Sequence, residues 1–255
     1  MKIIFENNDI SVVIKEPGED SEEKSCGSNV PQLLREHWGV PDAYVGVVHR
    51  LDNATGGVMV YARNKAAAAA LSEQTAAHSM SKEYVCICAG VPEPSEGEMK
   101  NWLFKDSRKN KVFPVKGPRK GAKDALLNYK VLRSYTLAAE AEGSASAAAS
   151  DNTSDSDASR TTVSEKICAD DSDKMSERAG CTVSMCSVSL CTGRTHQIRV
   201  QFASRKHPLL GDRKYGSRVT GPLALFCRSL TFTVPGTAEA QTFTAELPDY
   251  FSAYM

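Results

Sequence analysis

The sequence predicts an α+β fold in which a mixed, mostly antiparallel central sheet is flanked by helices and loops. Apolar, β-branched segments of strand length recur along most of the chain, whereas helical spacing of apolar residues occurs in only a few irregularly placed segments. Strands and helices do not alternate regularly, which argues against a doubly wound parallel sheet. The chain has 255 residues, of which 41% are hydrophobic, so we expect a single domain over residues 1–255 with a sizeable core.

The first part of the chain is expected to contain short strands and one helix. Residues 3–14 have the pattern of two strands around an Asn-Asn-Asp turn. Pro31 suits the first turn of a helix over 31–38, in which Leu and Trp side chains have helical spacing. Strands are expected at 46–49 and 57–61, and the polar segment RLDNATG between them is predicted to be a loop.

Two more helices and several strands complete the expected fold. Asn64 is a suitable N-cap for a helix over 65–78, where five consecutive alanines favour helix. Another helix, over 195–204, would open with Thr-His-Gln. Further strands are expected at 82–89, 128–132, 182–190, 223–234 and 241–245.

The zero net charge of the chain conceals two oppositely charged parts. Residues 137–177 hold ten acidic and three basic residues, a net of −7, so the remaining residues carry +7. This segment has almost no aromatic or large aliphatic side chains, and such a composition cannot offset its chain entropy by burial. We therefore predict a disordered, low-complexity insertion at a loop tip inside the domain. The alternative is that residues 137–177 act as an acidic competitor, which screens a basic site of the same chain.

A concentrated basic segment precedes this insertion. Residues 100–123 hold nine lysines and arginines against Asp106 alone, with Trp102, Phe104 and Phe113 interleaved. A solvated, lysine-rich hairpin explains such a run in many proteins. The density of charge and the aromatic side chains fit a surface that contacts phosphates equally well.

The cysteines and the hydropathy of the chain restrict its class. The eight cysteines form no Cys-x-x-Cys pair and no zinc-site spacing with histidine, so we expect no metal site and reduced thiols. Cys86 and Cys88 alternate with apolar residues and are expected to be buried on one face of a strand. No apolar run is long enough for a membrane span, and the N-terminus lacks the pattern of a signal peptide. These features predict a cytoplasmic protein with no membrane partner.

Two segments hold candidates for chemistry. Asp52 follows a strand in VVHRLDNATGG, with Arg50 shortly before it. A carboxylate at a strand end can face a cleft, and a partly buried one needs a positive partner. The segment TGRTHQIR supplies Arg194, His196 and Arg199, of which the last two would share a helix face. From these residues alone, Asp52 as a turn or cap residue and Arg199 as a surface ion pair remain alternatives.

The segments HRLDNATGGVMVYARN, KEYVCICAG and TGRTHQIRVQFASRKHPLLGDRKYG, in this order, closely resemble the motif series of the RluA family of pseudouridine synthases. KEPG at 15–18 resembles the family's opening element, and the segment 230–251 resembles its closing strand pair. The chain departs from the family's usual Thr-Ser-Gly at 55–57, where it has Thr-Gly-Gly. We expect no room for the small RNA-binding S4 module that precedes the catalytic domain in some members.

The resemblance implies the pseudouridine synthase fold, with a cleft at the centre of the sheet. It also implies isomerisation of specific uridines in structured RNA, either ribosomal or transfer RNA. The uracil would be cut from its sugar at N1, turned and rejoined through C5, so no cofactor is implied. The target uridine must be flipped out or already lie in a loop. We expect the enzyme to act as a monomer.

The resemblance also implies roles for individual residues. Asp52 would be the catalytic aspartate, and Arg199 would pair with it and keep it ionised. Tyr84, in the segment KEY, would stack on the target base and take part in proton transfer. Ile198 would pack against the base, and Arg50 would fill the vacated stack or clamp a neighbouring phosphate. The other residues expected to bind substrate are Arg194 and His196.

Two other functions remain open from the sequence. The first is a catalytically inactive RNA-binding or ribosome-assembly module, against which the joint presence of Asp52, Tyr84 and Arg199 argues. The second is a glycoside or nucleoside hydrolase, which usually needs a pair of carboxylates. Asp52 has no obvious second acid in the sequence.

Deletion of residues 139–176 is expected to leave catalysis intact and to tighten non-specific RNA binding at low salt, because it removes acidic charge that competes with RNA for a basic surface. Binding of an unrelated RNA at low and physiological salt measures this effect. A variant that keeps the segment but carries Asn and Gln in place of its acids is the control. Unchanged binding after the deletion would show that the charge of this segment does not act on the site.

Overall fold

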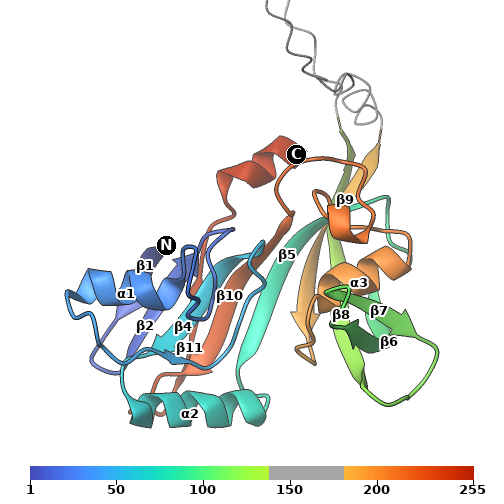
Figure 1. Ribbon diagram of the computed structural model, residues 1–255. Helices are drawn as coiled ribbons and strands as arrows, with labels where there is room; N and C mark the ends of the chain where they lie inside the picture. The colour runs from blue at the N-terminus through green and yellow to red at the C-terminus, as the bar shows by residue number, and fades with distance from the viewer. Residues whose placement is uncertain (138–180) are drawn as a thin grey trace, which may run out of the picture.

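The computed structural model describes residues 1–137 and 181–255 (Figure 1). The predicted acidic insertion, 137–177, lies outside the described residues apart from Leu137. This leucine is buried directly after the last residue of a long strand.

One sheet of eleven strands organises the described part of the chain. Its strand order is β1-β2-β4-β10-β5-β9-β8-β6-β7, with β11 added to β10 and β3 added to β4. Within the described residues the pairings are antiparallel except that of β4 with β10. This confirms the predicted mixed, mostly antiparallel sheet. The strands are β1 (Lys2–Glu6), β2 (Ile10–Lys15), β3 (Gly46–Val47), β4 (Gly56–Ala62), β5 (Ser81–Ala89), β6 (Glu96–Asp106), β7 (Lys111–Val115), β8 (Ala122–Thr136), β9 (Thr182–Leu190), β10 (Leu225–Thr233) and β11 (Ala240–Thr244).

Each of the first two helices begins after an asparagine cap, of which Asn64 was the predicted one. In α1 (Val30–Trp38) the Asn29 side chain accepts a hydrogen bond from the Gln32 N–H, and proline occupies the first turn. In α2 (Lys65–Ala76) the Asn64 side chain accepts from the Ala67 N–H, as expected for an N-cap. These bonds satisfy backbone donors that the first turn of a helix leaves free.

The third helix begins later than the sequence pattern suggests. The predicted helix over 195–204 is observed as α3 (Gln197–Ser204), so its proposed start is wrong by two residues. The reason is His196, whose φ of 51° places it in the left-handed region outside the helix. Two short 3₁₀ helices follow, η2 (Arg213–Tyr215) and η3 (Asp249–Tyr254).

The sheet buries apolar side chains on both faces. Along β4, Val58 and Val60 belong to one cluster, and Met59 and Tyr61 to the other, as the alternation of a strand requires. Leu71 from α2 joins the first cluster, whereas Leu34 from α1 and Phe202 from α3 join the second. Cys86 and Cys88 are fully buried in the second cluster, which confirms their predicted place on one strand face.

The face of the sheet that carries the second cluster, called the second face, is covered by α1 at one end and by α3 at the other. Figure 1 shows β1, β2, β4 and β10 with α1 at one end, and β6, β7 and β8 with α3 at the other. Strand β5 lies between these groups, since it pairs with β10 on one side and with β9 on the other. The predicted basic segment, 100–123, forms the β6–β7 hairpin and the start of β8 beside α3.

The parallel contact between β4 and β10 depends on Gly57. This residue has a φ of +135°, and a Cβ atom there would collide with the backbone of Cys227 in β10. Cys227 is also its register partner in the pairing. A glycine is therefore required for the two strands to approach.

Gly57→Ala is expected to lower the free energy of unfolding by roughly 3 kcal/mol, because it adds both backbone strain and a collision inside the sheet. Urea denaturation followed by circular dichroism measures the change. Gly117→Ala is the matched control, since a Cβ atom at Gly117 would meet nothing within 4 Å. Equal stability of the two variants would contradict the proposed role of the close approach.

Candidate active site

A cavity of about 560 Å³ lies on the second face of the sheet. It is bounded by the loop before β4, by β5 and by the segment that leads into α3. Each of the seven residues selected from the sequence contributes to its wall. They are Arg50, Asp52, Tyr84, Arg194, His196, Ile198 and Arg199. The fold therefore gathers three segments that are far apart in the sequence around one space.

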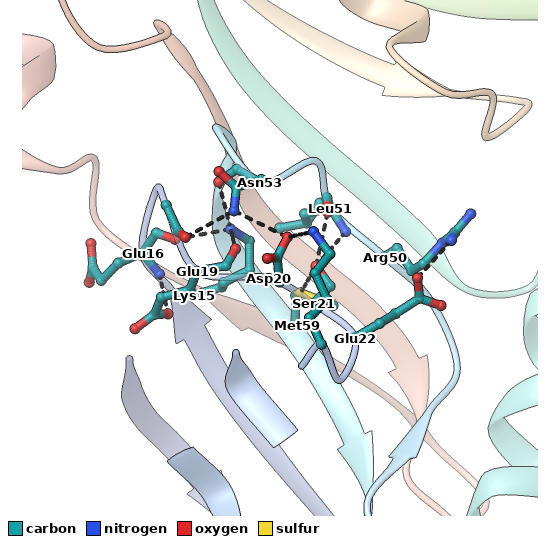
Figure 2. A network of polar contacts seen from close by, with 12 residues as sticks. Lys15, Glu16, Glu19, Asp20, Ser21, Glu22, Arg50, Leu51, Asn53 and Met59 are labelled. Carbon is teal, nitrogen blue, oxygen red and sulfur yellow. Dashed lines mark hydrogen bonds and ion pairs between the residues drawn. The ribbon is translucent and has the colours of Figure 1, made fainter. Parts of the chain in front are cut away.

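The loop that carries Asp52 is held on both sides by the segment after β2 (Figure 2). On one side, the Ser21 hydroxyl donates to the Leu51 carbonyl at 2.9 Å and accepts from the Leu51 N–H at 3.1 Å. On the other side, the Asn53 carbonyl accepts from the Gly18 N–H at 2.8 Å. Because both neighbours of Asp52 are fixed, its carboxylate leaves the loop in a defined direction.

Lys15 is the buried centre of this support. Its ammonium group donates to the carbonyls of Glu16, Glu19 and Asn53 at 2.9, 2.8 and 3.2 Å. Burial lowers the pKa of Lys15 to about 8. The sequence marked this lysine only as part of the opening KEPG element, and its role depends on an Asn53 carbonyl that comes 38 residues later.

Asp52 faces two basic side chains from the start of α3. Its Oδ2 lies 3.7 Å from Nη1 of Arg199 and 3.8 Å from Nε2 of His196. The Asp52 side chain is 30% exposed, so the carboxylate is reachable from the cavity. The contact with Arg199 is an ion pair without a close hydrogen bond.

The hydrogen-bonded partner of Arg199 is Asp212, which the sequence reasoning missed. The guanidinium group donates from Nε and Nη2 to the two carboxylate oxygens at 2.7 and 2.8 Å, and both side chains are buried. This bidentate bond fixes the plane of the guanidinium group and leaves Nη1 directed at Asp52. Asp212 lies in GDRKYG, the end of the third segment that resembles the family, and no local sequence pattern marks its acid as a partner of Arg199.

Tyr215, at the end of the same motif, determines the orientation of His196. The hydroxyl of Tyr215 accepts the Val112 N–H at 3.0 Å and lies 2.8 Å from Nδ1 of His196. The proton of the Tyr215 hydroxyl is thus available for donation to Nδ1 of His196. Burial lowers the pKa of His196, and this favours the neutral ring. A neutral ring that accepts at Nδ1 carries its proton on Nε2, and this N–H faces Asp52.

Tyr84 and Ile198 form apolar walls of the cavity. Tyr84 is 5% exposed and Ile198 is 4% exposed, and both belong to the second hydrophobic cluster. Burial raises the pKa of the Tyr84 hydroxyl well above its usual range, so this group stays protonated. A flat apolar ligand could pack between such surfaces.

Arg50 and Arg194 lie further out. Arg50 is exposed and forms an ion pair with Glu22 at 2.8 Å. Arg194 donates to the Asp124 carbonyl at 2.8 Å and to its carboxylate at 3.1 Å, which ties the start of α3 to β8. In this structure both arginines are thus engaged with acidic residues.

No group of three or more His, Cys, Asp or Glu in residues 1–137 and 181–255 could hold a metal ion. Within the same residues, no helix is both long and apolar enough to cross a membrane.

Known proteins resemble this chain along most of its length. A family described as RNA pseudouridylate synthase matches residues 12–204. An uncharacterized RNA pseudouridine synthase of Aquifex aeolicus is 30% identical over 274 aligned residues, which cover 99% of this chain and 71% of the relative. Ribosomal large subunit pseudouridine synthase D of Neisseria meningitidis is 26% identical over 218 residues, with 80% of this chain and 46% of the relative covered. The solved structure of Human RNA Pseudouridylate Synthase Domain Containing 1 matches the fold with a TM-score of 0.67 at 21% identity, covering 97% of this chain and 83% of that one.

His196 is expected to carry its proton on Nε2 in the free protein, because Tyr215 donates to Nδ1. The ¹⁵N NMR shifts of the imidazole distinguish the two tautomers. Tyr215→Phe removes the donor and should yield a mixture of tautomers, whereas Tyr44→Phe, at a tyrosine that is 42% exposed, should not change them. A proton on Nδ1 in the unmodified protein would contradict this assignment.

Proposed function

The chain belongs to the RNA pseudouridylate synthase family, whose members are isomerases, and on that premise we propose that it converts specific uridines in structured RNA to pseudouridine with Asp52 as the catalytic residue. The observation that carries this proposal is the position of Asp52. Its partly exposed carboxylate lies in a cavity, 3.7 Å from the Arg199 guanidinium group, and Tyr84 and Ile198 line the same cavity.

The reaction changes bonds without changing the composition of the RNA. The bond between the sugar C1′ and N1 of uracil breaks, and a bond between C1′ and C5 forms after the base has turned. The proton on C5 is lost, and N1 gains one. Asp52 attacks the sugar, attacks the base or removes a sugar proton, and each of these routes requires its ionised form.

Arg199 and His196 both direct donor groups at this carboxylate. A guanidinium group within 4 Å stabilises a carboxylate, and so does an N–H group directed at it. Because Asp212 holds Arg199 and Tyr215 holds His196, these donors need not reorganise when charge develops. Their role is to position and stabilise the reacting carboxylate.

Tyr84 and Ile198 bind the detached uracil. A base that turns between cleavage and rejoining must be retained, and the buried faces of these side chains exclude water from it. The protonated Tyr84 hydroxyl is able to donate a hydrogen bond there and to take part in proton transfer.

The substrate is RNA whose target nucleotide has left its stack. A uracil inside a helix cannot reach a carboxylate within a cavity, so it must be flipped out or lie in a loop. Arg50, on the cavity wall, releases Glu22 when RNA binds and then either fills the gap that the flipped base leaves in the stack or binds a phosphate. Arg194 binds the RNA beside it. The basic β6–β7 hairpin is close to α3 and contacts more of the backbone.

We also propose the wider setting that the sequence predicts. The chain forms a single catalytic domain with the acidic insertion between β8 and β9, and it works as a cytoplasmic monomer. Ribosomal or transfer RNA is the substrate class, and the name of the Neisseria relative supports ribosomal RNA.

The test compares Asp52→Asn with the unmodified protein on ribosomal and transfer RNA from cells that lack the gene. Pseudouridine, detected as carbodiimide-dependent stops of reverse transcription, should fall by roughly 10³-fold or more, because the amide cannot act as a base or nucleophile. RNA binding should persist.

Asp42→Asn, at an exposed aspartate outside the cavity, is the control and should remain active. Retained activity of Asp52→Asn would refute the role of Asp52. RNA binding by the unmodified protein without any such stops would instead favour the inactive RNA-binding or ribosome-assembly module.

A further inference from the structure

Lys82 is a cation of the cavity wall that the catalytic assignment does not use. It lies in β5, two residues before Tyr84, so both side chains leave the same face of the strand. Within the described part of the chain, the ammonium group of Lys82 makes no hydrogen bond or ion pair. Burial lowers the pKa of its ammonium group, as expected for a charge that has lost water without gaining a partner.

The other lysines and arginines of the cavity wall, with the exception of Lys105, differ from Lys82 in this respect. Each arginine of the wall is bound to a carboxylate, as is Lys24. The pairs are Lys24 with Asp20, Arg50 with Glu22, Arg194 with Asp124 and Arg199 with Asp212. Lys105 is unpaired within the described residues as well, but it is exposed on the β6–β7 hairpin. Lys82 is therefore the partly buried cation of this cavity whose charge the described residues leave unbalanced.

His49 adds a second unsatisfied donor to the same wall. Its Nε2 accepts the Val60 N–H at 3.1 Å, and burial together with the nearby charge of Lys82 holds its pKa well below the usual range. The ring is thus neutral, with its proton on Nδ1. Nδ1 is buried and has no partner among the described residues.

Unpaired donors of this kind favour an anionic ligand. A partly buried ammonium group without a partner is costly, and a ligand that brings negative charge offsets this cost. The three carboxylates of the wall, Asp20, Glu22 and Asp52, already face other cations. RNA supplies negative charge through its phosphates, whereas the carbonyl oxygens of uracil are neutral and offset the ammonium charge less.

We propose that Lys82, with the Nδ1–H group of His49 beside it, forms a subsite that binds a phosphate of the nucleotide whose uracil is isomerised. This inference rests on the proposed function. Tyr84 and Lys82 are separated by two residues of an extended strand, about 7 Å. One strand thereby holds the base and a phosphate of the same nucleotide, and this sets the position of the sugar against Asp52.

The test measures the binding of uridine, uridine 5′-monophosphate and uridine 3′-monophosphate to the full chain by NMR titration. The unmodified protein should bind at least one monophosphate roughly tenfold or more tightly than uridine. Lys82→Met should bring this ratio close to one and leave the affinity for uridine unchanged. Lys65→Met removes a positive charge from the exposed start of α2, outside the cavity, and should keep the ratio.

Two further variants sharpen the result. Lys82→Arg keeps a positive charge and should keep most of the preference, and Lys82→Gln replaces Lys82→Met if the latter fails to fold. In His49→Gln, the amide oxygen can accept the Val60 N–H in place of Nε2, but the donor at Nδ1 is lost. This change should therefore lower the ratio of monophosphate affinity to uridine affinity in part.

The proposal is overturned if the unmodified protein shows no preference for a monophosphate, including the case in which none of the three ligands binds. It is also overturned if the preference survives Lys82→Met, or if this change weakens uridine and the monophosphates equally, since Lys82 would then contact the base. Pseudouridine formation by the unmodified protein is measured separately, so failure of the subsite is distinguishable from failure of the proposed function.

Discussion

The bidentate bond between Arg199 and Asp212 fixes most of the candidate site. Both side chains are buried, and a charge left unpaired there would cost about 3–5 kcal/mol. The bond joins α3 to the short segment that carries Tyr215, whose ring also lies against the Arg199 guanidinium group at 5.2 Å. Tyr215 in turn binds His196. A single ion pair thus determines where the two basic groups that face Asp52 can lie.

Asp52 itself is supported from the opposite side. The segment after β2 bonds to the residues before and after it, and the Lys15 ammonium group joins three carbonyls beneath the loop. The carboxylate is thereby placed between two rigid supports that come from opposite ends of the sheet. Such preorganisation suits a carboxylate that acts on a bound ligand, because little reorganisation is needed when the ligand arrives.

The cavity combines groups that are fully satisfied with groups that are not. Arg199 has a buried partner in Asp212 and also faces Asp52, whereas the Lys82 ammonium group and Nδ1 of His49 have no partner among the described residues. A folded protein gains nothing from buried donors without acceptors. Their presence beside Tyr84 is understandable if the missing acceptor arrives with the substrate.

The sequence by itself determined much of the local structure, and it indicated seven residues that the fold gathers around one cavity. Strand alternation, Pro31 in the first turn of α1, the cap at Asn64 and the motif containing Asp52 depend on residues close together in the chain, so these patterns can be recognised without a structure. His196 was the local exception, because its left-handed backbone has no marker such as glycine.

Only the tertiary structure decided which side chains meet. Asp212, Tyr215, Lys15 and Lys82 acquire their meaning from partners or from a cavity wall, and a sequence pattern cannot supply these. The Val112 N–H that orients Tyr215, for example, is 103 residues away. Local residues determine backbone conformation, but the order of strands in the sheet determines which of them become neighbours. That order, with β10 inserted between β4 and β5, brings Asp52, Tyr84 and Lys82 to one cavity.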